Sequence, residues 1–197
     1  PPPCRVARRR PAGPPSTPEL AAYFERASVW PGEGCLAEVN LAAPTLATRL
    51  ARMVGEGAMI TFDYGYETAK LYAPWRREGT LLSFYKHASD TNPYGRVGHQ
   101  DLTAHVDWTA LRAAGELVGL ITAIDTTQSE LLAALGIGGY LVEPIKGTGL
   151  EEHLARRRAV SDLLDPAGLG RIRAMVQYRG GARLGQALQA LGSGHHG

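Results

Sequence analysis

Residues 57–67 read Gly-Ala-Met-Ile-Thr-Phe-Asp-Tyr-Gly-Tyr-Glu and contain the strongest strand signal in the chain. The near-continuous apolar run 58–62 is typical of a strand that is covered on both faces, as in a parallel sheet. Open α/β sheets bind ligands outside the carboxyl ends of their strands, which makes Asp63, Tyr64 and Gly65 candidate functional residues. A strand-end turn in which Asp63 caps local backbone N–H groups explains the same residues equally well.

Helical patterns alternate with apolar runs on both sides of this strand. The first helix is expected to begin at Pro18, because Thr17 is a favourable N-cap and proline suits the first helical position. This alternation predicts an α/β fold with a largely parallel sheet. Only about four strands are recognisable, whereas a complete dinucleotide-type sheet has roughly six, so the sheet is expected to lack its beginning. The expected helices are 18–27, 40–54, 109–115, 129–135 and 151–164, and the further strands are 35–39, 117–124 and 171–178.

The domain organisation follows from composition. Residues 1–18 are rich in proline and arginine, and they are expected to be disordered because they bury little apolar surface. Residues 19–191 are expected to form one domain, with an irregular polar and aromatic insertion at about 66–108. Residues 192–197 are expected to be a flexible tail. Within the domain, the helix after Asn40 carries one apolar stripe, formed by Leu46, Leu50, Met53 and Val54.

Bulk composition excludes several classes of function. The 197 residues carry a formal net charge of +2, which is too small to indicate nucleic-acid binding. No apolar run approaches the roughly 20 residues of a membrane helix, and the first residues do not resemble a signal peptide. Two cysteines, Cys4 and Cys35, form neither a disulfide framework nor a metal knuckle. We therefore expect a cytoplasmic protein with no membrane partner.

The densest polar cluster is 99–108, His-Gln-Asp-Leu-Thr-Ala-His-Val-Asp-Trp. Its alternation predicts a short strand with an apolar face and an opposite polar face. The polar face consists of Asp101, Thr103, His105 and Asp107, which would line a cleft or bond one another. Asp101, Thr103 and His105 are expected to face a cleft together with Asp63. A metal site built on His99, Asp101, His105 and Asp107 is a weaker alternative. In another alternative, Asp107 and Thr109 simply cap the helix that follows.

Five stretches in this order resemble the MidA-like S-adenosylmethionine-dependent methyltransferases. The stretch 57–67 is similar to their "iDYGy" strand, and 98–108 is similar to their "G-x-x-D-[IL]-T-A-H-V-D-[FW]" segment. Residues 76–87 resemble "R-x-G-T-L…Y…H", residues 127–137 resemble the "TQ…FL…LGI" helix, and residues 164–170 resemble "L-x-x-P-x-x-M-G". Together they cover about residues 19–178.

The resemblance implies a Rossmann-like class I methyltransferase fold, with S-adenosylmethionine as cofactor. Mitochondrial members of the family methylate an arginine of a respiratory complex I subunit and act in the assembly of that complex. The family's glycine-rich cofactor loop, acidic ribose-binding strand end and Asn-Glu-aromatic-aromatic-Asp-Ala-x-Pro segment are not found in this sequence. The expected sheet is thus incomplete, and we expect the chain alone to bind the cofactor weakly and to be inactive. The alternative is a catalytically inactive fragment or a protein-binding module.

The resemblance also suggests roles for individual residues. Asp63, Tyr64, Asp101 and His105 are the candidate catalytic residues, and Gly65 is the candidate for close approach to the cofactor. Carboxylates would hold an acceptor guanidinium, because they accept bidentate hydrogen bonds from arginine. The candidate substrate-binding residues are Glu67, Thr103 and Asp107. No metal is expected, and the expected partners are a protein substrate, such as a respiratory complex subunit, and a second copy in a homodimer.

Overall fold

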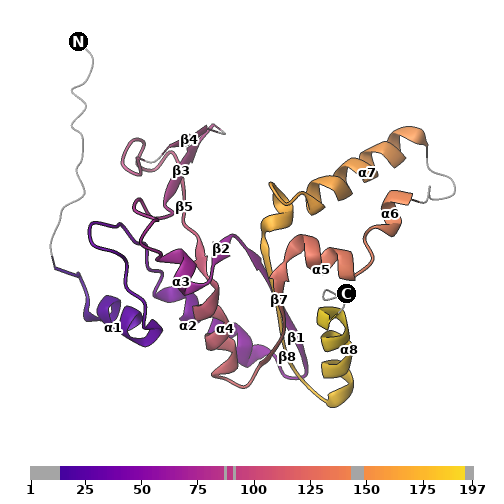
Figure 1. Cartoon of the computed structure of the whole chain (residues 1–197), viewed down its shortest axis with the longest axis horizontal. Helices are drawn as coiled ribbons and strands as arrows, with labels where there is room; N and C mark the ends of the chain where they lie inside the picture. The colour runs from indigo at the N-terminus through magenta and orange to yellow at the C-terminus, as the bar shows by residue number, and fades with distance from the viewer. Residues whose placement is uncertain (1–13, 87, 91, 143–148, 194–197) are drawn as a thin grey trace, which may run out of the picture. The chain divides into compact units, whose positions relative to one another are not determined.

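The computed structural model describes residues 14–86, 88–90, 92–142 and 149–193. Disorder was expected for 1–18 and a flexible tail for 192–197, and of these 1–13 and 194–197 lie outside the described residues. Thr17 and Pro18 instead begin α1 (Pro18–Ala27), and residues 192 and 193 belong to α8 (Ala182–Ser193), so the expectation is wrong for these four positions. The chain divides into two compact units (Figure 1). The first unit contains the described residues up to 41 together with 68–105, and the second contains 42–67 together with the described residues from 106 onward. The stretch 68–105 nearly coincides with the expected insertion.

The second unit is built on a sheet with the strand order β1-β8-β7. Its strands are β1 (Gly57–Asp63), β7 (Ile121–Thr127) and β8 (Arg173–Arg179). Each is close to an expected strand, but β8 is antiparallel to both neighbours, so the expectation of a largely parallel sheet is wrong. The apolar run carries no information on the direction of neighbouring strands. The expectation that β1 is covered on both faces is also wrong, because Ile60 and Phe62 are exposed on one face.

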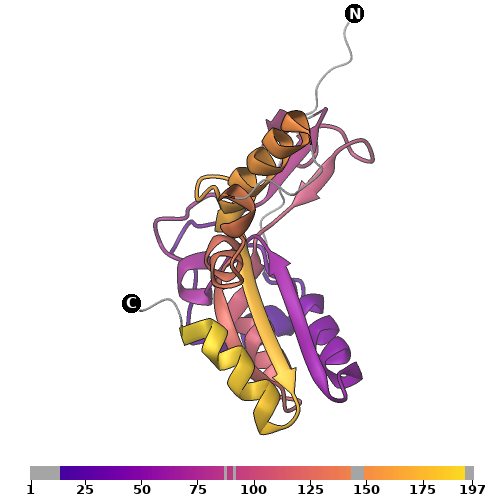
Figure 2. The same ribbon diagram turned by 90° about the vertical axis from the view of Figure 1, so that its right-hand side faces the viewer.

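Helix α8 (Ala182–Ser193) covers one face of this sheet, and α2 (Ala42–Met53) and α4 (Trp108–Glu116) lie on the opposite face (Figure 2). On the α8 side, Leu188 and Leu191 pack against a cluster of buried residues. The cluster consists of Ile124, Leu131, Ala174 and Val176. Helix α8 was not expected, although Leu184, Leu188 and Leu191 have the i, i+4, i+7 spacing of an amphipathic helix.

Helix α2 forms where it was expected, but its apolar stripe does not face the core. Ala47 and Ala51 are buried instead, whereas Leu46, Leu50 and Met53 are exposed. Small side chains let two helices approach closely, and α2 packs against α4, where the Thr48 hydroxyl donates to the Ala114 carbonyl at 3.3 Å. The alanines therefore form the contact, and the larger side chains lie on the other side of the helix.

The remaining elements of the second unit extend from the ends of its strands. Strands β2 (Gly65–Tyr66) and β6 (Val106–Asp107) form a short parallel pair. After β7, Thr127 caps α5 (Gln128–Ala134) in a capping box with Glu130, and α5 lies close to the helix expected at 129–135. Next come α6 (Gly139–Val142), α7 (Leu150–Leu164) and the 3-10 helix η1 (Leu169–Arg171).

The first unit has an aromatic cluster and a small sheet. Helix α1 (Pro18–Ala27) has the expected bounds, and Thr17 caps it. Its Tyr23 and Phe24 pack edge-on against Tyr72, one residue beyond α3 (Thr68–Leu71). Residues 35–39 form no strand. The expected irregular insertion contains an antiparallel sheet of order β4-β3-β5, formed by β3 (Leu82–Tyr85), β4 (Ala88–Asp90) and β5 (Asp101–Thr103).

Among the described residues, no helix has the length and apolar character required to cross a membrane.

Candidate functional site

The carboxyl end of β1 is an exposed turn. Asp63 is exposed, and its Oδ1 accepts a hydrogen bond from the Tyr64 backbone N–H at 2.7 Å. The Tyr64 carbonyl accepts from the Val106 N–H at 2.9 Å, and this bond aligns β2 with β6. Asp63 therefore makes the local cap that the sequence allowed, and its exposed carboxylate also remains accessible to a ligand.

Gly65 follows this turn and lies against the chain itself. A Cβ atom at this position would lie 2.1 Å from the Val106 carbonyl oxygen and 2.7 Å from Trp108 Nε1. Trp108 is fully buried, so neither neighbour can move away easily. Glycine is therefore needed at position 65 for packing within the chain, and the expected approach of a cofactor to Gly65 stays a prediction.

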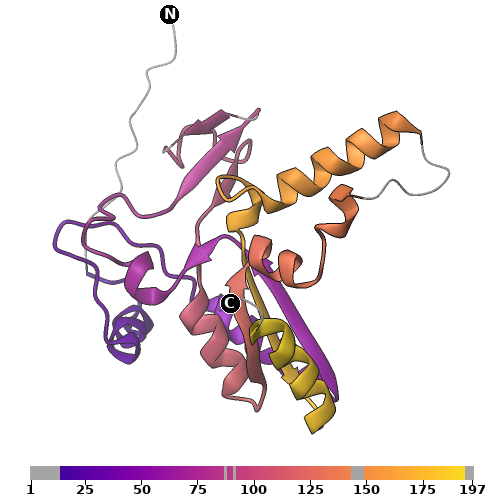
Figure 3. The same cartoon turned by 45° about the vertical axis from the view of Figure 1, so that its right-hand side comes forward.

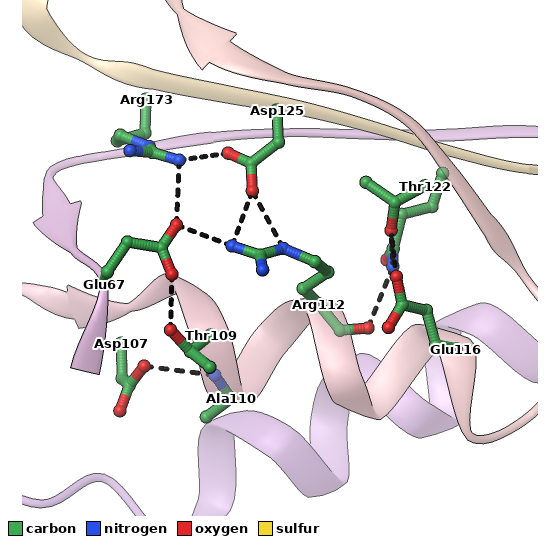
Figure 4. Close-up of polar contacts among 10 residues, drawn as sticks. Glu67, Asp107, Thr109, Ala110, Arg112, Glu116, Thr122, Asp125 and Arg173 are labelled. Carbon is green, nitrogen blue, oxygen red and sulfur yellow. Dashed lines mark hydrogen bonds and ion pairs between the residues drawn. The ribbon is translucent and has the colours of Figure 1, made fainter. Parts of the chain in front are cut away.

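Glu67 lies at the centre of a charged network that joins β2 to α4, β7 and β8 (Figure 4). Its Oε1 lies 2.5 Å from Arg112 Nη2 and 3.2 Å from Arg173 Nη2, and its Oε2 accepts from the Thr109 hydroxyl at 2.5 Å. Asp125, at the other side of the network, accepts from Arg112 Nε at 2.9 Å and also pairs with Arg173. Two guanidinium groups thus already occupy the carboxylate that was expected to bind a substrate arginine.

The network determines the protonation of Glu67. Burial raises the pKa of this carboxyl, but the Thr109 hydrogen bond and the charges of Arg112 and Arg173 outweigh burial and hold the pKa below its ordinary value. The four charged side chains of the network are between 16% and 32% exposed. Partial burial strengthens such interactions relative to open water, so the network rigidifies the region just beyond the carboxyl end of β1.

Asp107 has a structural role. Its Oδ1 accepts a hydrogen bond from the Ala110 backbone N–H at 3.1 Å and caps α4. This confirms for Asp107 the alternative in which it caps the helix that follows. The continuous strand expected across 101–108 is wrong, because β5 pairs with β3 while β6 pairs with β2. Between β5 and β6, the His105 backbone N–H donates to the Thr80 hydroxyl rather than to a neighbouring strand. Leu102, which was expected on the apolar face, is exposed.

The remaining candidates lie in the first unit. Asp101 and Thr103 are exposed on β5, and His105 is half-buried. The Thr80 hydroxyl accepts from the His105 N–H at 3.0 Å and donates to the Glu38 carboxylate at 3.2 Å. A cavity of about 390 Å³ lies beside this chain of hydrogen bonds, and Arg76, Glu78, Thr80 and His105 are among its lining residues.

The predicted site residues therefore belong to two units. Asp63, Tyr64, Gly65, Glu67 and Asp107 are in the second unit, and Asp101, Thr103 and His105 are in the first. Their convergence on one cleft stays a prediction. Within the part of the chain that the structure describes, no three His, Cys, Asp or Glu side chains are grouped to hold a metal ion, so the metal-site alternative gains no support.

Sequence reasoning missed Arg112, Asp125 and Arg173. Asp125 carried a usable signal, since it is a carboxylate near the carboxyl end of an expected strand. The two arginines lie 61 positions apart, on α4 and at the start of β8, and no local pattern connects them. Only the antiparallel arrangement of β8 brings the start of that strand beside the carboxyl ends of β1 and β7, where Glu67 and Asp125 lie.

Comparisons with known proteins identify similar sequences and structures. Residues 7–125 match a family described as "Putative S-adenosyl-L-methionine-dependent methyltransferase". A crystal structure of an uncharacterized protein from Burkholderia thailandensis is 30% identical with a TM-score of 0.76, covering 92% of this chain and 46% of that one. A second structure from the same organism, described as a "likely methyl transferase" bound to S-adenosyl-homocysteine, is 29% identical, also with a TM-score of 0.76. It covers 94% of this chain and 46% of that one. No curated protein matches the chain.

Proposed function

Because the chain belongs to the family of S-adenosyl-L-methionine-dependent methyltransferases, we propose that it takes part in methyl transfer from S-adenosylmethionine. The observation that carries the proposal is the Burkholderia thailandensis relative bound to S-adenosyl-homocysteine, which is the cofactor after loss of its methyl group. The present chain spans 46% of the length of that relative, so the activity is proposed for the complete catalytic unit.

Gly65 offers the cofactor no close approach on the side of its Cβ position. The space beside Gly65 is filled by the Val106 carbonyl and the Trp108 indole, and the sequence contains no glycine-rich loop after a strand. Asp63 is the residue best suited to contact the cofactor or the acceptor, because its carboxylate is exposed at the carboxyl end of β1. We therefore propose that most contacts to the cofactor come from the part of the catalytic unit that corresponds to the uncovered portion of the solved relative.

The acceptor that we infer is an arginine side chain of a protein, in a respiratory complex subunit by resemblance to the family's mitochondrial members. Carboxylates suit this acceptor, since they pair with a guanidinium in a bidentate manner. Glu67 already holds two guanidinium groups and Asp107 caps α4, whereas Asp63 and Asp101 are exposed. Asp63 in the second unit and Asp101 in the first therefore remain, each by itself, the candidate carboxylates for a guanidinium.

Transfer of a radiolabelled methyl group tests this function. The chain is incubated with labelled S-adenosylmethionine and a protein extract, alone and together with the part of the Burkholderia thailandensis relative that it does not cover. Labelled proteins are then hydrolysed and analysed for methylated amino acids. We expect no transfer by the chain alone, and methylarginine when the added part is present. Asp63→Asn and Asp101→Asn are expected to reduce transfer at least tenfold, whereas Asp162→Asn on the exposed part of α7 is expected to leave it unchanged.

Each other outcome has a definite meaning. Label in methyllysine or in small molecules would refute an arginine acceptor. Normal transfer by the Asp63→Asn and Asp101→Asn variants would refute the site assignment. Complete absence of methyl transfer, although the chain and the added part of the relative form a complex, would favour the non-catalytic protein-binding alternative. Micromolar binding of S-adenosylmethionine to the chain alone, measured by calorimetric titration, would contradict the assignment of the cofactor site to other residues.

A further inference from the structure

The first unit contains a cavity of about 390 Å³ to which the proposed function assigns no role. This volume lies within the range of ligand pockets, roughly 300–1,000 Å³, so the cavity can hold a long side chain together with adjoining backbone. Its lining residues all belong to the first unit. Three leucines give it an apolar wall, Leu36, Leu81 and Leu82, and the polar groups include Arg76, Glu78 and Thr80.

Hydrogen bonds hold the wall of this cavity in place. The stretch that follows α1 runs beside the stretch that leads into β3 (Figure 3), and the Leu36 N–H donates to the Arg77 carbonyl at 2.8 Å. The Thr80 N–H and hydroxyl both donate to Glu38 Oε2, at 2.8 Å and 3.2 Å. Gly79 has a φ of +69°, and a Cβ at this position would overlap the Glu38 carboxylate. The cavity is therefore preformed, which lowers the entropic cost of binding a ligand.

Two carboxylates give this cavity a negative character. Glu78 is exposed and forms no hydrogen bond or ion pair with any residue in the described part of the chain. The Glu38 carboxylate lies directly behind Gly79 and Thr80, and both hydrogen bonds from Thr80 go to the same one of its oxygens. An exposed carboxylate beside an apolar wall suits a ligand that has an apolar stem and a cationic end.

Arg76 brings an opposing charge to the cavity, but its side chain is already engaged within the chain. Its Nε donates to the Lys70 carbonyl at 3.4 Å, and its guanidinium carbon lies 4.8 Å from the centre of the Trp75 ring. A guanidinium that is held over an aromatic face by a cation–π contact is less available to an anionic ligand. Of the two side chains, Glu78 is therefore the one that is open to a ligand of opposite charge.

We propose that this cavity binds an arginine side chain of the acceptor protein, with the methylene stem along the three leucines and the guanidinium paired with Glu78. Long basic side chains bury their stems on apolar surface and keep the charged end near water, which fits the exposed position of Glu78. Arginine is preferred to lysine because a planar guanidinium pairs with both oxygens of a carboxylate. The identity of the ligand as a protein rests on the proposed function. The cavity supplies a recognition contact for that protein in addition to the candidate carboxylates Asp63 and Asp101.

Peptide binding to the whole 197-residue chain tests this inference without cofactor or methyl transfer. The probe is acetyl-Gly-Gly-Arg-Gly-Gly-amide, and the comparison ligands are the same peptide with Lys, Leu or Glu in place of Arg, and free arginine. The amide resonances of 79–82 are followed by heteronuclear NMR during each titration, because this measurement detects binding with a Kd of about 1 mM. Glu78→Gln removes the pairing charge. Glu33→Gln is the matched control, because Glu33 is also exposed and does not line the cavity.

We expect the arginine peptide to shift the resonances of 79–82 and to bind about threefold more tightly than the lysine peptide and about tenfold more tightly than the other ligands. Glu78→Gln should raise its Kd by about tenfold and Glu33→Gln by less than about twofold, with unchanged thermal melts because both side chains are exposed.

The inference fails if the arginine peptide does not bind, or if the two variants bind it equally. It also fails if the glutamate peptide binds more tightly, because the ligand would then be an anion, or if free arginine binds as tightly as the peptide, because the ligand would then be a small molecule. Absence of methyl transfer with peptide binding intact would refute the proposed function alone. Formation of methylarginine without peptide binding would refute this inference alone.

Discussion

Arg112 Nη2 lies 2.5 Å from Glu67 Oε1, so a side chain of α4 holds the residue that directly follows β2. This pair places an arginine of the chain itself on the carboxylate that was predicted from the sequence to bind the substrate. An acceptor guanidinium that bound both oxygens of Glu67 would compete with Arg112 and Arg173 for Oε1, with the loss of charge-assisted hydrogen bonds. Glu67 is therefore better understood as a residue that stabilises the end of the sheet.

Glu67→Gln should lower the free energy of unfolding by about 1–2 kcal/mol at neutral pH, because it removes the charge that Arg112 and Arg173 share. The expected value is modest because the side chain is about one third exposed and solvent screens the interaction. Denaturant unfolding measures it. Glu152→Gln is the control, since that glutamate forms an exposed pair with Arg156 and its loss should cost less than about 0.5 kcal/mol.

The effect of Glu67→Gln should depend on pH in one direction. The pKa of Glu67 in the folded chain lies below its ordinary value of 4.5, so the ionised carboxylate stabilises the fold above about pH 4.5. That contribution is lost as the pH falls through the folded-state pKa. The difference in stability between the unsubstituted chain and the variant should therefore shrink in acid. A difference that grows below pH 4.5 would show that the sign is wrong.

Gly65→Ala should destabilise the chain by about 3 kcal/mol, because its Cβ would overlap the Val106 carbonyl and the buried Trp108 ring. Thermal and denaturant unfolding measure the loss. Gly139→Ala is the matched control, since a Cβ there meets nothing within 4 Å and alanine favours the helix α6. Equal stability of the two variants would mean that the tight packing at Gly65 is absent in solution.

Thr80→Val should lower stability by about 1–2 kcal/mol, because it removes the hydroxyl that links Glu38 to the His105 backbone. Thr80→Ser keeps the hydroxyl and should be nearly neutral. Hydrogen exchange at the His105 amide provides a local readout, and it should become faster only in the valine variant. Fast exchange in the unsubstituted chain would contradict the hydrogen bond between His105 and Thr80.

Elements with local signals could be predicted closely from the sequence. Thr17 and Pro18 determine where α1 begins, and Thr127 with Glu130 begins α5, because a helix cap depends only on residues within one turn. The apolar run after Gly57 likewise indicated β1, and one alternative from the sequence had Asp107, together with Thr109, capping α4.

Features that depend on distant partners required the tertiary structure. The direction of β8, the outward turn of the α2 stripe and the division of 101–108 between two sheets each depend on a neighbour far along the chain. The charged network has the same origin, because Arg112 and Arg173 reach Glu67 only after the strands have paired. Hydrophobic periodicity and capping therefore determined elements such as α1, α5 and β1 from the sequence alone, since both act over a few residues. Which face each element buries and which charges meet were decided by packing against partners far along the chain, as when α2 buries Ala47 and Ala51 against α4.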